Sequence, residues 1–435
     1  QAERIKEELS KNKTLEGAVK SGFKMGLTPI IDGNVTIVIV AAILMGAFGP
    51  TDGFWAKVFN PIFFWFGPST AGTIYSFGFT LLTSVLLNFV FGVWATRVMI
   101  RGAVHFKPLR KAWLFGGKKE GGADFKTPSI NFIGNRKKFY TFSCALIAIV
   151  LVFCGIFGVK MDVEFKGGSM VTLSYEGEAD LNALKSTIST ELNKSNLTLQ
   201  TGSDISGSQT LTVTLPGSET LTTDQMNSLL TTLNEQYPAN NFVQNEVNNV
   251  DATIGKEFLL KSIVALIAAC VLILLYVAYR FRKIGGLKAG STAIVALLHD
   301  MFVVFGVFVI LRIPLNGNFI AALLTILGYS INDTVVIYDR IRENSALYSK
   351  KQMGLAELVN LSINQSFARS LMTSITTCLA LGVVCVISVI YRLDSIYSFA
   401  FPLLFGMVSG VYSTICIATP LWVDWKSKKK AAKKA

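Results

Sequence analysis

The stretch Gly328-Tyr-Ser-Ile-Asn-Asp-Thr-Val-Val-Ile-Tyr338 places one acidic residue, Asp333, in a run of apolar and hydroxyl side chains. It closes a longer apolar segment, residues 318–338, which is long enough to cross the ~30 Å hydrocarbon core of a bilayer as a helix. A charged group at that depth is costly unless it is paired or hydrated. The stretch therefore predicts a membrane protein, and it marks Asp333 as a candidate functional residue.

The composition of the 435-residue chain supports a membrane protein. Hydrophobic residues make up 51% and charged residues 16%, whereas soluble domains carry about 25% charged residues. This excludes a purely soluble protein. An aromatic segment, residues 54–66, is too short to span and is predicted to lie at the membrane interface. The eight predicted spans are residues 34–50, 71–98, 139–158, 258–280, 287–311, 318–338, 369–391 and 396–424.

The net charge of +13 is sorted along the chain. Residues 97–138 hold eleven basic residues, whereas residues 160–251 hold four lysines against twelve acidic residues, a net charge of −8. Because basic loops stay in the cytoplasm, we expect residues 160–251 outside the cytoplasm and both ends of the chain inside it. The lysines of residues 426–434 could bind either nucleic acid or anionic lipid. We expect lipid and no nucleic acid.

Residues 167–249 follow the patterns of a soluble domain. Residues 171–175 and 211–215 alternate as strands, and residues 197–200 and 242–247 are weaker strands. Leucines recur at helical spacing after the cap candidates Asp180 and Thr223. The order β-α-β-β-α-β predicts a ferredoxin-like fold. The domain has no His and no Cys, which favours binding over catalysis.

The sequence repeats at an offset of 336–340. Residues 3–7 match residues 339–343, and residues 15–36 match residues 355–376. This predicts two pseudo-symmetric halves, as in many transporters. The first half is expected to lack its earlier spans and its own outer domain, so that the chain is a fragment. The predicted organisation is 1–33, cytoplasmic amphipathic segment; 34–101, last spans of the first half; 102–138, basic linker; 139–158, first span of the second half; 159–257, outer domain; 258–424, five-span bundle; 425–435, basic tail.

Further polar groups lie at or near membrane depth. Arg369 enters the next span from the same side as Asp333, so the two can meet. If Arg369 moved away from Asp333 and back, the Asp333 carboxylate would take up a proton and then release it. The alternative is a static ion pair between the two residues. Asp300 lies beside His299. This His-Asp pair is expected either to relay protons or simply to hydrogen-bond to a backbone carbonyl. The cluster of residues 339–343 is expected to be a solvated helix end that sets orientation. The predicted lining of a polar path is Ser330, Asn332, Ser366, Ser370, Thr373, Thr376 and Thr377, with Ser330, Asp333 and Thr334 as one stripe.

Residues 296–300, 321–344 and 369–377 closely resemble SecF, a bacterial protein-export membrane protein, and residues 139–424 cover that subunit. Residues 3–9 and 32–36 resemble the C-terminal end of its partner SecD. The chain thus resembles the C-terminal part of a fused SecDF protein of the resistance-nodulation-division superfamily.

The resemblance implies an accessory factor of the SecYEG translocon that uses the proton motive force to promote preprotein translocation and membrane-protein insertion. It implies proton conduction by Asp333 and Arg369, together with an aspartate of the missing SecD half. The implied partners are SecYEG, that SecD half, YajC, the YidC insertase and the preprotein.

Two other classes stay open: a scaffold that stabilises the translocon or insertase without transport, and a small-molecule or lipid exporter of the same superfamily. No enzyme is expected, because the sequence lacks a phosphate-binding loop and a nucleophile elbow. No cofactor or metal is expected either, since the six cysteines lie in apolar runs without ligand spacing. The coupling ion, proton or Na⁺, stays open.

Overall fold

The computed structural model describes residues 2–66, 72–117, 129–177, 179–194, 197–203, 209–216, 221–348, 352–391 and 393–431. Linker residues 118–128 and tail residues 432–435 lie outside these ranges. Within the described part, eight helices are long and apolar enough to cross a membrane, which confirms the predicted number. They run over Leu15–Phe48, Ile74–His105, Arg136–Phe157, Thr253–Arg280, Gly286–Ile310, Gly317–Leu347, Leu355–Ile390 and Ile396–Ser427.

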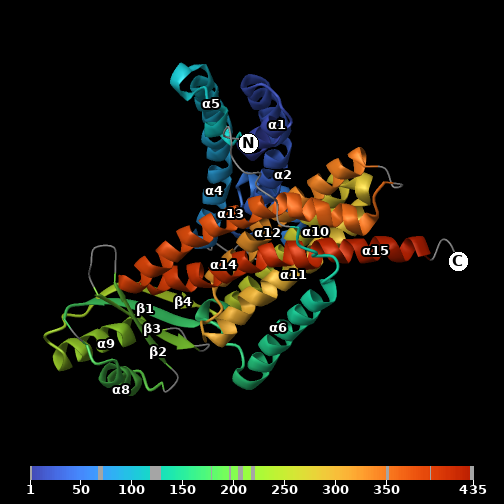
Figure 1. The fold of residues 1–435 in the computed structure, drawn as a ribbon. Helices are drawn as coiled ribbons and strands as arrows, with labels where there is room; N and C mark the ends of the chain where they lie inside the picture. Colours follow the sequence, from blue (N-terminus) through green and yellow to red (C-terminus); the bar gives the residue numbers. More distant parts are fainter. Residues whose placement is uncertain are drawn as a thin grey trace.

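The helical elements follow the chain order of Figure 1. In the first half they are α1 (Ala2–Ser10), α2 (Leu15–Phe48), α3 (Phe54–Phe63), α4 (Gly72–Leu87), the π-helical η1 (Asn88–Ala95), α5 (Thr96–His105), η2 (Lys107–Leu109) and η3 (Ala112–Phe115). In the second half they are α6 (Arg136–Phe157), α7 (Val163–Lys166), α8 (Leu181–Glu191), α9 (Thr223–Gln236), α10 (Ala252–Arg280), η4 (Arg282–Ile284), α11 (Gly286–Ile310), α12 (Gly317–Leu347), α13 (Leu355–Ile390), α14 (Asp394–Ser413), η5 (Thr414–Ala418) and α15 (Thr419–Ala431).

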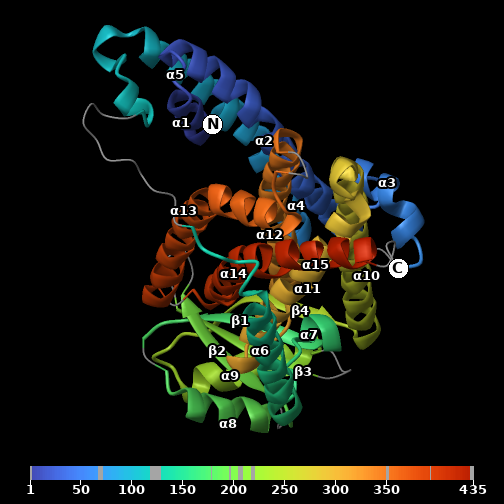
Figure 2. The same cartoon turned by 45° about the vertical axis from the view of Figure 1, so that its right-hand side comes forward.

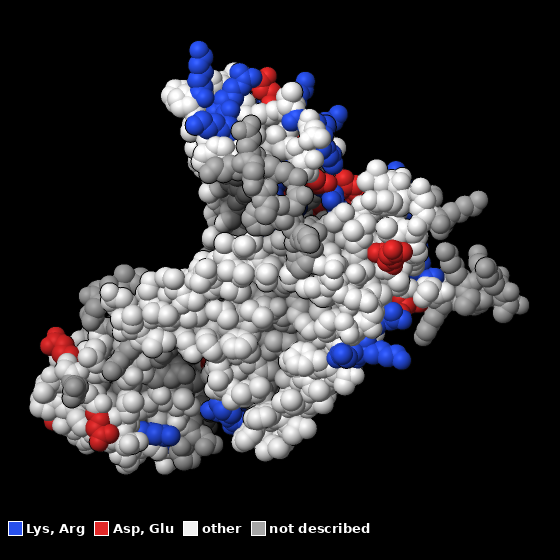
Figure 3. Space-filling model, viewed as in Figure 1, with Lys and Arg blue, Asp and Glu red and all other residues white. Residues whose placement is uncertain are grey.

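The helix α12 forms the centre of the bundle. It packs against α2, α10, α11, α13 and α14, and most of its residues are buried. By contrast, α4, α5, α6 and α13 expose many apolar side chains. Figure 3 shows a broad surface band with almost no charged groups between the α1 and α5 end and the small domain. The charge-bearing stretch quoted above therefore lies on the helix most enclosed by protein.

The predicted boundary between residues 33 and 34, where a cytoplasmic helix was expected to run into a span, lies inside one helix and stays a prediction. Residues 15–48 form one continuous helix, α2, which packs beside α4. The aromatic segment forms α3, a ten-residue helix with Phe54 and the following Trp65 exposed. This geometry suits an interfacial position.

The small domain, residues 168–250, has the predicted fold. Its strands are β1 (Gly168–Tyr175), β2 (Thr198–Ser203), β3 (Gln209–Pro216) and β4 (Val243–Val250). They form an antiparallel sheet of order β2-β3-β1-β4, in which Val171 lies opposite Val213 and Val247. Apolar side chains of α8 and α9 close the core against the sheet. The cap of α9 is Thr222, one residue before the expected Thr223, because Thr222 and Gln225 form a reciprocal capping box.

The small domain is attached to the bundle beside the start of α12. Leu315 exchanges backbone hydrogen bonds with Lys160 and Asp162, at 2.9 and 3.0 Å. The Glu164 side chain accepts a hydrogen bond of 2.6 Å from the Gly317 amide. Figures 1 and 2 place the domain at the end of the molecule opposite α1 and α5. The helix that carries Asp333 thus begins at the root of the small domain.

Candidate functional site

Asp333 lies between α12 and α13. Its Oδ1 atom accepts a hydrogen bond of 2.7 Å from the Ser370 hydroxyl. Its Oδ2 atom is buried and has no hydrogen-bond partner among the described residues. Arg369 interacts with Asp333 electrostatically, but the described side chains form no direct ion pair. One carboxylate oxygen is thus held in place while the other is left for water or a proton.

The face of α13 toward α12 is lined by serines four residues apart. Ser370 belongs to this row, in which Asn344 donates to Ser362 at 2.9 Å, and Tyr329 and Ser374 share a hydrogen bond of 3.3 Å. Ser366 and Ser370 belong to the lining predicted from the sequence, whereas Ser362 and Ser374 do not. A spacing of four was the available signal, because it keeps side chains on one helix face. The buried row is Ser362, Ser366, Ser370 and Ser374.

Among the described side chains, the predicted threonines of α13 form no hydrogen bond with Asp333. Thr373, Thr376 and Thr377 donate to backbone carbonyls of their own helix, and Thr373 and Thr376 are exposed. A hydroxyl in a helix often forms this local bond when no neighbour offers a partner. Their role in lining a path stays a prediction.

Asp300 forms a separate cluster on the other flank of α12. It is fully buried and accepts hydrogen bonds of 2.6–2.7 Å from Ser330, Ser409 and Ser413. His299 lies 3.4 Å away, and its Nε2 atom is buried without a partner among the described residues. All the short bonds to Asp300 come from hydroxyl groups, so the carboxylate is fixed rather than mobile.

The predicted stripe of Ser330, Asp333 and Thr334 is divided in the structure. Ser330 faces Asp300, and Thr334 shares a hydrogen bond of 2.8 Å with Thr414. Asp333 instead faces Ser370. Residues 333 and 334 differ by about 100° around a helix, and α12 has neighbours on all sides, so they meet different helices.

A third buried group joins the two halves at a similar level. Asp32 of α2 is 5% exposed and accepts from Arg280 Nε at 2.7 and 2.8 Å and from the Tyr276 hydroxyl at 2.9 Å. Arg280 Nη2 completes an ion pair with it at 2.6 Å. Neither Asp32 nor Arg280 is among the site residues predicted from the sequence.

The next residue of α2, Gly33, brings the halves close together. A Cβ atom there would lie 2.1 Å from the Asn332 side chain, so any larger residue would force the Asn332 side chain to move. Asn332, predicted to line the polar path, thus lies against the first half rather than toward Ser370. The Asn34 Nδ2 atom is buried without a partner among the described residues.

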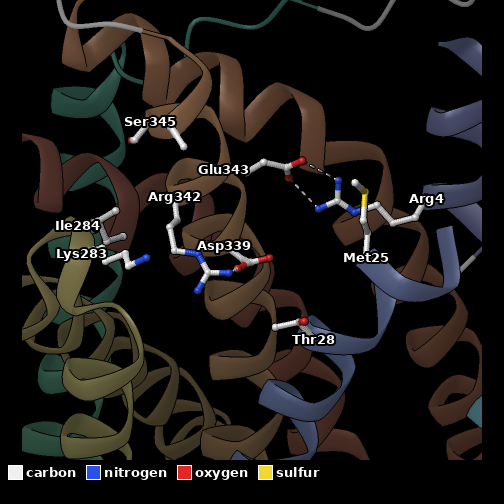
Figure 4. Close-up of a pocket in the computed structure, with 10 residues that line it drawn as sticks. Arg4, Met25, Thr28, Lys283, Ile284, Asp339, Arg342, Glu343 and Ser345 are labelled. Atoms are coloured by element: carbon white, nitrogen blue, oxygen red, sulfur yellow. Dashed lines mark hydrogen bonds and ion pairs between the residues drawn. The ribbon is translucent and has the colours of Figure 1, made fainter. Parts of the chain in front are cut away.

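The sequence predicts a solvated helix end at residues 339–343 of α12. This prediction is wrong, because these side chains are largely paired. Asp339 is 7% exposed and pairs with Arg342, and Arg340 and Glu343 pair with α1. Figure 4 shows Glu343 and Arg4 pointing toward each other. Both residues line an open pocket of about 480 Å³. The cluster is partly covered because α1, which repeats its sequence, forms ion pairs with it.

These features define a class of protein. The chain is a multi-pass helical membrane protein with one small α+β domain, and it carries buried carboxylates bound by hydroxyl and guanidinium groups within its spans.

Comparison with known proteins gives the family. A family profile described as "Protein export membrane protein SecD/SecF, C-terminal" matches residues 229–428. Protein translocase subunit SecF of Alicyclobacillus acidocaldarius is 35% identical over 70% of this chain and 96% of its own length. Protein translocase subunit SecDF of Bacillus subtilis is 29% identical over 98% of this chain and 54% of its own. The chain belongs to the SecD/SecF family of protein-export membrane proteins.

A solved structure has the same fold. The crystal structure of SecDF from Thermus thermophilus, titled a translocon-associated membrane protein, matches with a TM-score of 0.73 and 28% identity. The match covers 98% of this chain and 52% of that one. The chain therefore spans about half the length of the fused SecDF relatives and nearly the whole length of SecF.

Proposed function

We propose that this protein is an accessory factor of the Sec translocase that uses the proton motive force to promote preprotein translocation across the membrane, and insertion of proteins into it. The observation that carries the proposal is the half-satisfied carboxylate of Asp333, with Oδ1 held by Ser370 and Oδ2 buried without a partner. A buried carboxylate in this state is suited to take up and release a proton. Arg369, nearby but not paired, is the group whose approach favours release.

The polar environment of Asp333 is compatible with conduction. Buried hydroxyls of the α13 serine row extend one turn on either side of it. Asp300 is fully hydrogen-bonded, so we assign it a supporting role within the bundle rather than a carrier role. A proton that crosses 100 mV releases about 2.3 kcal/mol, so a few protons per cycle can drive a domain movement without a bound nucleotide. We propose accordingly that the protein is not an enzyme.

The orientation follows from the charge distribution. The acidic small domain is proposed to lie outside the cytoplasmic membrane of a bacterium, and the basic linker and tail inside it. SecYEG, the preprotein, YajC and the YidC insertase are the proposed partners, with the remainder of a SecD half completing the site. Membership of the SecD/SecF family supports an association with the Sec translocase.

The test compares wild-type protein with Asp333→Asn at matched membrane levels, at its natural length, in vesicles that contain the translocon. Export of a preprotein and proton uptake are measured with an imposed gradient and with an uncoupler. We expect Asp333→Asn to lose at least five-fold in both, and the uncoupler to add little. Asp224→Asn, an acidic residue in the first turn of α9, is the matched control.

Wild-type export by Asp333→Asn would overturn the proton-driven motor and favour the scaffold. Replacing the proton gradient by a sodium gradient tests the coupling ion. Stimulation by sodium alone would assign the carboxylate to Na⁺.

A further inference from the structure

Two asparagines of α13 hold the backbone of the linker that joins the halves. Asn364 binds both polar groups of Ile130: its Oδ1 accepts from the Ile130 amide at 2.9 Å, and its Nδ2 donates to the Ile130 carbonyl at 2.8 Å. Asn360 donates to the same carbonyl at 3.0 Å and accepts from the amides of Phe132 and Ile133, at 2.9 and 3.3 Å. We call Asn360, Asn364 and residues 130–133 the linker clamp.

The linker clamp is reinforced by packing. Phe132 and Ile133 are 6% and 3% exposed, and the Phe132 ring lies 5.5 Å from the Phe367 ring of α13. A side-chain amide that matches a backbone amide in both donor and acceptor repeats the pairing of a β-ladder. Five such bonds and two buried side chains exceed what a passing loop requires, because loops on a surface satisfy their backbone groups with water.

The linker clamp joins two elements of different function. On α13, Arg369 and Ser370 follow Asn364 by five and six residues, one and a half turns. On the other side, the chain turns at residues 132–135 and enters α6, which packs mainly against α11. Figure 2 shows the linker running past α13 before it enters α6.

The helix α6 leads directly to the small domain. Its 22 residues end at Phe157, and the backbone bonds of Lys160 and Asp162 to Leu315 follow within five residues. A helix of that length spans about 33 Å, which is the thickness of the hydrocarbon core. Movement of its linker end is therefore carried through the membrane to the root of the domain.

We propose that Asn360 and Asn364 are coupling residues: through the linker clamp they make α13 and α6 move together, so that a change at Asp333 is passed to the small domain. This inference rests on the proposed function. In this proposal, the linker clamp binds neither the proton nor the preprotein.

The test measures proton uptake and gradient-dependent export separately, in the vesicles described above. Asn360→Ala with Asn364→Ala is expected to keep proton uptake within two-fold of wild type and to lose at least five-fold in export stimulation. Asn227→Ala, an exposed asparagine on α9, is the matched control and is expected to change neither. Unchanged export, or a parallel loss of uptake and export, would overturn the proposal.

A cross-link supplies an independent arm that does not depend on how well the alanine variant folds. Ile130→Cys with Asn364→Cys is made in a background without the six native cysteines. The reduced form is expected to be uncoupled, and the disulfide to restore export to within two-fold of the cysteine-free parent. A formed disulfide that leaves export uncoupled would show that the attachment is not the cause.

Asp333→Asn is measured beside these variants. It is expected to lose uptake and export together. If it keeps both, the proposed function fails and the coupling inference fails with it, whereas a failure confined to the asparagine variants removes the coupling inference alone.

Discussion

Arg4 of α1 and Glu343 of α12 form an ion pair of 2.9 Å, and Arg340 and Glu7 form the reciprocal pair at 3.0 Å. Arg4 also pairs with Glu7 at 2.8 Å, and Arg340 with Glu343 at 3.0 Å. The four side chains therefore form a closed ring. Each residue of α1 in the ring has its counterpart 336 residues later in α12: Arg340 for Arg4, and Glu343 for Glu7. Two copies of one sequence that meet in this way form an interface of the kind a two-fold axis produces. The repeat in the sequence is thus a contact in the structure.

Reversing the charges of the ring tests its contribution. Arg4→Glu with Glu7→Arg keeps the Arg–Glu pair within α1 and the net charge. It breaks the two pairs to α12 and the 3.6 Å pair of Glu7 with Lys11. We expect a loss of about 2 kcal/mol, because partly buried pairs contribute about 1 kcal/mol each. Adding Arg340→Glu with Glu343→Arg restores opposite charges and should recover most of the loss. Thermal unfolding in detergent measures both, and a quadruple variant as unstable as the double one would contradict the ring.

The ring is also sensitive to acid. Burial acts to raise the pKa of Glu7, but the guanidinium groups of Arg340 and Arg4 outweigh it and lower the pKa below its ordinary value of 4.5. Its contribution to stability is therefore full above about pH 4.5 and falls as the pH drops through the lowered value. The Arg4→Glu, Glu7→Arg variant should lack this loss of stability at low pH.

Loss of Arg280 should destabilise the bundle strongly. Arg280→Leu leaves Asp32 buried with a single hydrogen bond from Tyr276, and an unpaired buried charge costs about 3–5 kcal/mol. Asp32→Asn with Arg280→Gln removes both charges and should recover part of that loss. The measurement is the yield and thermal midpoint of the purified protein. Equal behaviour of the single and double variants would mean that the pair is not coupled.

Ser370 is expected to affect proton uptake more than stability. Ser370→Ala removes the donor to Asp333 Oδ1, so we expect uptake to fall about three- to ten-fold, as if about 1 kcal/mol of a hydrogen bond were lost. Ser388→Ala is the control, because Ser388 is a buried serine of the same helix whose hydroxyl donates to the Val384 carbonyl at 2.8 Å. Uptake assays at equal protein levels compare the two variants. Equal rates would remove Ser370 from the site.

The root of the small domain should grow less stable as the pH rises. Burial raises the pKa of Glu164 above its ordinary value of 4.5, although the hydrogen bond from Gly317 opposes the shift, and Asp162 adds to it. The folded state then holds its proton when the unfolded state has lost it, so stability falls from about pH 4.5 upward through the raised value. Glu164→Gln keeps the acceptor for Gly317 and should remove most of this slope.

Thermal midpoints between pH 4.5 and 8 measure the effect. The gain of Glu164→Gln over wild type should increase with pH. Asp251 has the opposite sign, since hydrogen bonds from Thr253 lower its pKa, so Asp251→Asn should show no such gain. A Glu164→Gln difference that is constant with pH would contradict the prediction.

Much of the fold could be predicted from the sequence, because the relevant signals are local. Apolar length determines a span, and alternation or helical spacing determines a strand or helix. This explains why the eight spans and the β-α-β-β-α-β order of the small domain along the chain are found as expected. Asp333 could be singled out for the same reason: a carboxylate inside an apolar run is costly wherever its neighbours lie.

The partners of each polar residue could not be predicted in this way. Whether Ser330 faces Asp333 or Asp300 depends on the rotation of α12 and on which helices surround it, and both follow from the packing of the whole bundle. The pair of Asp32 with Arg280 joins residues 248 apart, and the clamp of Asn364 on Ile130 joins residues 234 apart. The sequence by itself determined which segments enter the membrane and where a charge is unusual, since these depend on the free energy of transfer of each segment. Only the tertiary structure decided which charges and hydroxyls meet, because that depends on the shapes of all the helices at once.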